Sequence, residues 1–123
     1  MERTGVMNKQ QMTEMLKGTL EGIVLEILAT QPAYGYEITA QLREQGFSDV
    51  VEGTVYALLV RLERRGLVDV EKVPSAKGPP RKVYSLNGRG EEYLSGFWRT
   101  WDFLVERIQQ LHPRKEHPQE EGQ

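Results

Sequence analysis

The sequence predicts a mainly α fold of the α+β class, built from helices and one short β-hairpin. Apolar residues recur every three or four positions in four segments, which is the period of an amphipathic helix. Between the third and fourth of these segments the period falls to two, and a loop rich in proline and glycine interrupts it. A chain of 123 residues, 38% of them hydrophobic, is long enough for one domain with a core and too short for two.

Residues 12–30 are predicted to form the first helix. Its apolar positions are Met12, Leu16, Leu20, Ile23, Val24, Ile27 and Leu28. Gly18 lowers the helix propensity, and we interpret it as a place of close backbone packing. Pro32 ends the helix, because the residue before a proline disfavours the α conformation. Residues 1–10 carry no periodicity and are predicted to be a flexible arm.

Two shorter helices are predicted next, over residues 35–45 and 52–65. Gly46 and Gly66 follow them at the position where a glycine commonly ends a helix. The apolar positions of the first of the two are Tyr36, Ile38 and Leu42, and the core side of the second carries Val55, Leu58, Leu59 and Leu62.

A β-hairpin is predicted to follow. Its strands are marked by Leu67, Val68 and Val70 and by Val83, Tyr84 and Leu86, and residues 74–80 form the loop between them. Three helices followed by a basic hairpin is the element order of a winged helix-turn-helix. We therefore assign residues 11–87 to such a DNA-binding domain with a two-stranded β wing.

Residues 88–112 are predicted to form a long C-terminal helix, which Asn87 caps. Its apolar stripe is Leu94, Phe97, Trp101, Leu104, Ile108 and Leu111, and Trp98 and Val105 widen it. A helix of about 36 Å with such a stripe is too long for so small a domain to bury. We expect the same helix of a second copy to cover it, in a two-fold homodimer. Residues 113–123 are polar and predicted to be disordered.

Charge is unevenly distributed along the chain. The net charge of −2 argues weakly against nucleic-acid binding, but residues 61–89 carry eight basic and three acidic side chains, and no acid occurs from Lys72 to Arg89. From Glu91 to the end the net charge is −3. A local basic region matters more than the sum for binding a polyanion.

Two groups of side chains are candidates for contact with DNA. Thr54, Tyr56, Arg61, Arg64 and Arg65 lie away from the core side of the third helix, where the early positions suit base edges and Arg61 suits phosphate or guanine. An ordinary solvated helix surface explains them about as well. Lys77, Arg81 and Lys82 flank the hairpin loop and suit the backbone beside a minor groove. The alternative for these is a soluble loop with incidental charge.

Trp98 and Trp101 lie three positions apart on one helix. They either pack in a dimer core or line a flat pocket that stacks an aromatic or cationic ligand, and the two interpretations are compatible. Other chemistry has little support. The chain has no cysteine, and His112 and His117 lack companion ligands, so we expect no metal and no cofactor. No catalytic motif occurs, no apolar run approaches a membrane span, and no signal pattern is present. We therefore expect a cytoplasmic protein that is not an enzyme.

Three stretches resemble the PadR family of transcriptional regulators. "EGTVYALLVRLERRGLV" (52–68) is similar to the family's recognition helix, "AYGYEITAQLRE" (33–44) to the helix before it, and "KGPPRKVYSLNGRGEEYL" (77–94) to its wing and the entry to the last helix. The resemblance covers roughly residues 14–111. The chain departs from the family pattern at Ala57, where proline is common, at Pro79, where arginine is common, and at Asn87, where threonine is usual.

The resemblance implies a homodimeric repressor of the small branch, which has a single C-terminal helix. Its operator would be an inverted repeat. A small aromatic or hydrophobic effector bound at the dimer interface would relieve the repression. The residues that would face DNA are Tyr36, Thr54, Tyr56, Arg61, Lys77, Gly78, Arg81 and Lys82. The effector would contact Trp98, Trp101 and Val105, and the dimer would be formed by Leu16, Leu20, Leu94, Phe97, Trp101, Leu104, Ile108 and Leu111. The alternative is a winged-helix module for protein contacts without sequence-specific DNA binding, which the acidic net charge favours.

Overall fold

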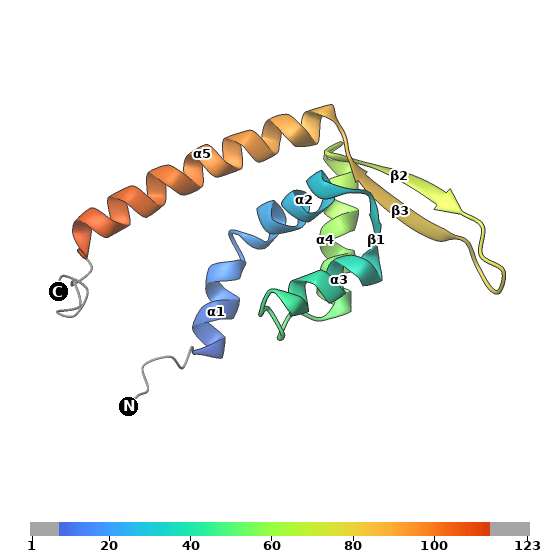
Figure 1. Cartoon of the computed structure of the whole chain (residues 1–123), viewed down its shortest axis with the longest axis horizontal. Helices are drawn as coiled ribbons and strands as arrows, with labels where there is room; N and C mark the ends of the chain where they lie inside the picture. Colours follow the sequence, from blue (N-terminus) through green and yellow to red (C-terminus); the bar gives the residue numbers. More distant parts are fainter. Residues whose placement is uncertain (1–7, 114–123) are drawn as a thin grey trace, which may run out of the picture.

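The computed structural model describes residues 8–113 and confirms the predicted class, with five helices and a small antiparallel sheet in that range (Figure 1). In chain order the elements are α1 (Lys9–Leu16), α2 (Leu20–Thr30), β1 (Ala33–Tyr34), α3 (Gly35–Glu44), α4 (Glu52–Arg64), β2 (Val68–Val73), β3 (Arg81–Leu86) and α5 (Gly88–Leu111). The predicted arm is wrong for its last residues, because Asn8 accepts a hydrogen bond from the Gln11 amide at 2.9 Å and caps α1. Residues 1–7 of that arm and residues 114–123 of the predicted tail lie outside the described residues.

The prediction of one continuous helix over residues 12–30 is wrong. The chain leaves the helix after Leu16 and starts α2 at Leu20, and the hydroxyl of Thr19 donates to the Met15 carbonyl at 3.2 Å within the break. Gly18 faces open space, so it breaks the helix and does not serve a close contact as we had expected. α1 buries no residue, which leaves it attached to the rest of the domain mainly through α2.

The core lies between α2, α3 and α4. The predicted limits of α3 and α4 are confirmed to within one residue, and Gly46 and Gly66 end them with φ angles of 103° and 75°. The side chains with no exposed surface are Val24, Leu25, Ile38, Leu42, Val55, Leu59 and Leu62. They come from these three helices alone, so the helices form one packed unit that carries the wing and α5.

The sheet has three strands in the order β1-β3-β2, not two. β2 and β3 form the predicted hairpin, with Val70 opposite Tyr84. β1 is only two residues long and pairs with β3 through Ala33 and Tyr34. No alternation is visible in so short a segment, which is why the sequence did not reveal it. Its consequence is that β3 is hydrogen-bonded to the chain directly before α3.

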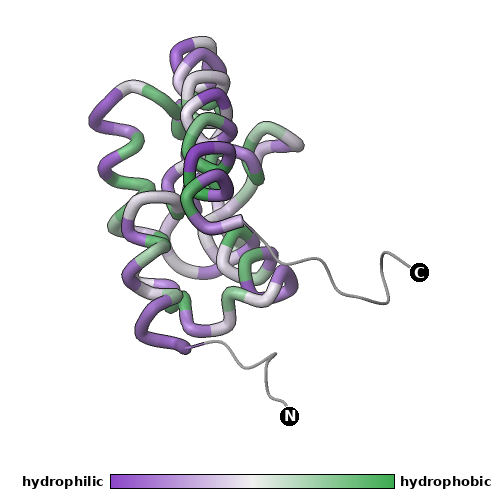
Figure 2. The backbone as a smooth tube through the Cα atoms, turned by 90° about the vertical axis from the view of Figure 1, so that its left-hand side faces the viewer, coloured by the Kyte–Doolittle hydropathy of each residue, from purple (hydrophilic) through white to green (hydrophobic). Residues whose placement is uncertain are grey.

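α5 is fixed to the domain at its first turns. The Asn87 side chain accepts from the Gly90 amide at 2.9 Å and donates to the Gly66 carbonyl at 3.0 Å. One turn later Leu94 is buried, and Phe97 packs on Gly22 of α2. Beyond this point α5 runs away from the body, in the direction opposite to the hairpin (Figure 1). Apolar and polar residues alternate around its turns (Figure 2).

Gly90 lies so close to the main chain of Leu67 that one added methyl group should destabilise the fold. A Cβ at this position would lie 2.1 Å from the Leu67 carbonyl oxygen, and backbone has little freedom to move. We expect Gly90→Ala to lower the free energy of unfolding by about 1–3 kcal/mol, measured by urea denaturation at fixed protein concentration. Gly96→Ala is the matched control on the same helix, since only the flexible Arg99 side chain lies near it, at 3.6 Å. It should be neutral or stabilising by up to about 1 kcal/mol; equal losses in both variants would contradict the packing argument.

Candidate nucleic-acid interface

The exposed side of α4 divides into three faces. Val55, Leu58, Leu59 and Leu62 are buried, and at about 100° per residue the positions farthest from them are Gly53, Ala57, Val60 and Arg64. All four are exposed. We call these four residues the outward face. Thr54 and Arg61 lie on one flank of it and Tyr56 on the other, so the sequence prediction selected the flanks and missed three of the four central residues.

The Thr54 flank faces a groove. Thr54 and Arg61 line a cavity of about 920 Å³ together with residues of α1 and of the loop before α4, and Gly53 and Ala57 of the outward face border it. Several apolar side chains line the same cavity, among them Met12, Leu16 and Phe47. The groove therefore joins α1 to the side of α4.

The Tyr56 flank faces the start of α3. A Cβ on Gly35 would lie 2.4 Å from a ring carbon of Tyr56, so this ring rests directly on the glycine backbone. Glycine is required there because any side chain would push the ring away. Tyr56 nevertheless remains 41% exposed. Its ring is thus held at one orientation beside the outward face.

Three side chains connect the wing to the start of α3. The rings of Tyr34 and Tyr36 stack with centroids 5.6 Å apart and planes 9° apart. The Arg81 guanidinium at the start of β3 lies 5.9 Å and 5.6 Å from the centroids of these two rings. This distance is within the range of a cation–π contact. Arg81 and Tyr36, which were predicted to face DNA, are therefore neighbours near the loop end of β3.

The wing presents basic side chains without internal compensation. Lys72 on β2 lies directly opposite Lys82 on β3, and both are exposed. Like charges at opposite positions of a strand pair are destabilising, so this arrangement favours a polyanion between or above them. Gly78 turns the loop with a φ of 84° and open space around it, and the Lys77 carbonyl accepts from the Ser75 hydroxyl at 2.7 Å.

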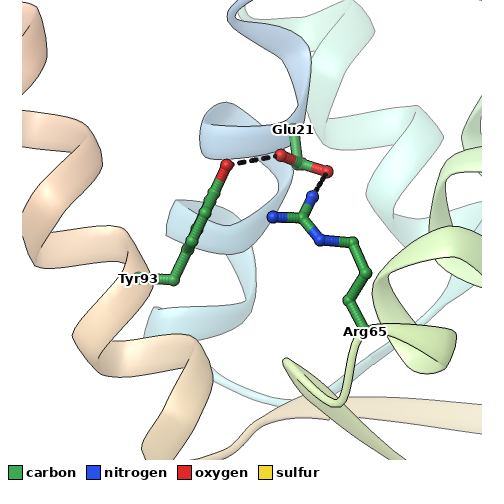
Figure 3. A network of polar contacts seen from close by, with 3 residues as sticks. All are labelled: Glu21, Arg65 and Tyr93. Atoms are coloured by element: carbon green, nitrogen blue, oxygen red, sulfur yellow. Dashed lines mark hydrogen bonds and ion pairs between the residues drawn. The ribbon is translucent and has the colours of Figure 1, made fainter.

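Arg65 is the exception among the basic residues of this region. Its guanidinium pairs with the Glu21 carboxylate at 2.5 Å and lies 4.8 Å from the centre of the Tyr93 ring (Figure 3). The Tyr93 hydroxyl donates to the same carboxylate at 2.9 Å. Contacts with Tyr93 and then with Glu21 raise the pKa of Arg65, so it stays charged. Arg65 therefore links the end of α4 to α2 and α5, a role that its place among the candidate DNA-facing arginines did not predict.

The two tryptophans are close but do not face each other. Their ring centroids are 6.5 Å apart and the planes meet at 88°, an edge-to-face contact that leaves no slot between parallel rings. The Trp98 indole N–H donates to Glu26 at 2.8 Å, and Trp98 lines a cavity of about 520 Å³ beside α2 and β3. Trp101 lines a different cavity of about 410 Å³ beside the break between α1 and α2. The half-buried Val105 lines neither.

The predicted dimer residues fall into two groups. Leu94 is only 7% exposed and belongs to the chain's own core, so little of it remains for a partner. Leu16, Leu20 and Phe97 are partly buried against that core. The others are exposed, and this group consists of Trp101, Leu104, Ile108 and Leu111. The apolar stripe on α5 is therefore packed against the domain near the start of the helix and exposed in the distal half.

Residues 8–113 contain neither a candidate metal site nor a candidate membrane-spanning helix. No group of three or more histidine, cysteine or acidic side chains in that range is placed to hold a metal ion. None of the described helices is both long and apolar enough to cross a bilayer.

Comparison with known proteins identifies the family. The sequence pattern of the transcriptional regulator PadR-like family matches residues 24–96, which is more than half of the chain. The chain belongs to the PadR-like family. The PadR-like match spans α3, α4 and the wing and ends where α5 leaves the domain body. The family consists of transcriptional regulators that bind DNA, so the chain is a regulator and not an enzyme.

Solved PadR structures resemble this one over most of its length. A PadR-like regulator from Bacillus cereus is 35% identical, with a TM-score of 0.72 over 83% of this chain and 99% of that chain. A PadR family regulator from Eggerthella lenta is 30% identical, with a TM-score of 0.78 over 86% and 92%. A transcriptional regulator from Streptococcus is 43% identical, with a TM-score of 0.70 over 79% and 95%. An uncharacterized protein of Lysinibacillus sphaericus shares 29% identity over 98 residues.

The two adjacent arginines at the end of α4 should behave differently. Arg64 lies on the outward face, so we expect Arg64→Ala to weaken binding to any DNA and to reduce the slope of log affinity against log salt by about 1. Arg65→Ala should leave that slope unchanged. It should instead lower the free energy of unfolding by about 1 kcal/mol or less, since the ion pair is partly exposed. Anisotropy titrations across a range of KCl concentrations, with urea denaturation of both variants, test this. A slope reduced equally in both variants would show that Arg65 also reaches phosphate.

Proposed function

We propose that the chain is a homodimeric, sequence-specific DNA-binding repressor whose operator is an inverted repeat. The observation that carries this is the junction at which Arg81 covers the stacked rings of Tyr34 and Tyr36. It holds the basic wing next to the helix pair α3 and α4. In a complex, α4 enters the major groove and the wings contact the flanking backbone, so one protomer covers one half-site.

The homodimer forms through α5. Its distal half exposes Leu104 and Ile108 by about half of their surface, which is unfavourable for a helix in water. Met12 and Leu16, which are partly exposed, give α1 an apolar side on the same protomer. We propose that each distal α5 packs against α5 and α1 of the partner subunit. The two α4 helices then lie about one turn of DNA apart, as the two half-sites require.

A small aromatic or hydrophobic effector would bind at the centre of this dimer and release the DNA. The 88° angle between Trp98 and Trp101 makes a sandwich within one protomer unfavourable, so a flat ligand would stack between equivalent rings of the two copies. Binding would change the angle between the two DNA-binding units, which requires different ligand affinities in the two states. Titration of tryptophan fluorescence with flat aromatic compounds detects such binding. The place of action is the cytoplasm.

The wing assignment predicts a loss that does not depend on sequence. Replacing both Arg81 and Lys82 by alanine removes two phosphate contacts and the cover over the tyrosine pair. We expect weaker binding to cognate and scrambled duplexes alike, and a salt slope reduced by about 2. Fluorescence anisotropy of the purified protein with its own upstream DNA and with scrambled DNA, at two salt concentrations, measures both. Unchanged affinity would refute the wing contact, and equal wild-type affinity for both duplexes would refute sequence-specific binding.

The dimer assignment predicts a change of oligomeric state. Leu104→Lys with Ile108→Lys places charges on the exposed apolar stripe without touching the protomer core. We expect a monomer in sedimentation velocity, with the circular dichroism of a folded helical domain. Glu106→Lys is the control for a new positive charge on the same helix away from the stripe. A double variant that sediments as the wild-type dimer would refute dimerisation through the distal half of α5.

A further inference from the structure

The outward face of α4 carries no hydrogen-bonding side chain before its last turn. Gly53, Ala57 and Val60 offer a bare backbone and methyl groups, and Arg64 is the first polar residue along it. In the major groove, G, C and A present only hydrogen-bonding atoms, whereas thymine also presents its C5-methyl group. The chemistry that this face recognises is therefore apolar.

We propose that Ala57 and Val60 select thymine in each half-site by contact with its C5-methyl group. This inference rests on the proposed function, because it requires α4 to lie in the major groove. Ala57 and Val60 are both exposed and are separated by about 4.5 Å along the helix axis, close to the spacing of about 3.4 Å between neighbouring bases. The two side chains thus read neighbouring or nearby base pairs.

The residues beside this face support the assignment. Gly53 has no neighbouring atom within 4 Å of the place of a Cβ, so the outward face is bare at its first position. Tyr56 is held on Gly35, and Thr54 and Arg61 line the groove toward α1, which Gly53 and Ala57 border from the outward face. The polar side chains therefore lie at the edges of the contact, where phosphates and outer base edges are found, and the centre is left to Ala57 and Val60.

Uracil tests this directly, because it differs from thymine only by the missing methyl group. The probe is a duplex enriched from a random pool by the full-length wild-type protein, in which each thymine is replaced in turn by uracil. We expect one position per half-site, or two neighbouring ones, where the replacement weakens binding about fourfold, and about fifteenfold when both half-sites are changed, as one buried methyl group per site implies.

The variants Val60→Ser and Ala57→Ser assign the effect to the protein side chains, because serine carries no methyl group. Both positions are exposed, so both variants should fold as the wild type does. Each should lose most of the thymine preference at its own position while its affinity for the uracil duplex stays within about twofold of wild type. Ala29→Ser makes the same chemical change at an exposed position of α2 and should keep the full preference.

The outcomes separate this inference from the proposed function. If the wild type enriches a sequence but binds every uracil duplex as tightly as the thymine duplex, methyl reading is refuted and the repressor stands. If uracil weakens the wild type and both variants equally, the methyl group acts through DNA shape, and the assignment to Ala57 and Val60 is refuted. If no sequence is enriched, the proposed function fails and the inference fails with it.

Discussion

The attachment of α5 at its first three turns is the constraint on which the rest of the molecule depends. Gly90 lies against the Leu67 carbonyl, and Phe97 lies against Gly22, so two glycines set how closely this helix approaches the domain. The same junction joins the wing, because Asn87 caps α5 and also bonds to Gly66 and Asp69 at the edge of the hairpin. The direction of α5 is thereby fixed relative to both the wing and α4, and in the proposed dimer this direction decides where the second copy places its own α4.

Few contacts connect α5 to α4. The two helices are separated by α2, and the network of Glu21, Arg65 and Tyr93 connects all three (Figure 3). The carboxylate of Glu21 is shared between a charge from the end of α4 and a hydroxyl from α5. A rotation of α5 would separate Tyr93 from this carboxylate before it disturbed the apolar core. The network is therefore a polar contact between α5 and α4 that can open without unfolding.

The helices were predictable where local chemistry decides them, as at Gly46, Gly66 and Asn87. Gly18 was misinterpreted because a glycine inside a helical pattern marks either a close contact or a break, and only the surroundings distinguish the two. The ion pair of Arg65 could not be predicted, since its partner Glu21 lies 44 positions away and no local pattern joins them. The outward face of α4 follows from helical geometry alone. It was missed because only polar side chains were taken as candidates for DNA contact, and Ala57 and Val60 carry no polar group.

The distribution of charge explains how an acidic chain suits a polyanion. The uncompensated pair of Lys72 and Lys82 lies at the wing, while the sequence from Glu91 onward carries a net charge of −3. The hairpin and the distal half of α5 point in opposite directions (Figure 1), so the basic wing is well separated from this half of α5, where Asp102 and Glu106 outnumber the single base Arg107. Near DNA, such a charge distribution turns the wing toward the phosphates and α5 away from them. In the proposed complex, affinity comes from the wing through charge, and the uncharged centre of α4 remains free to distinguish bases by shape and methyl contact.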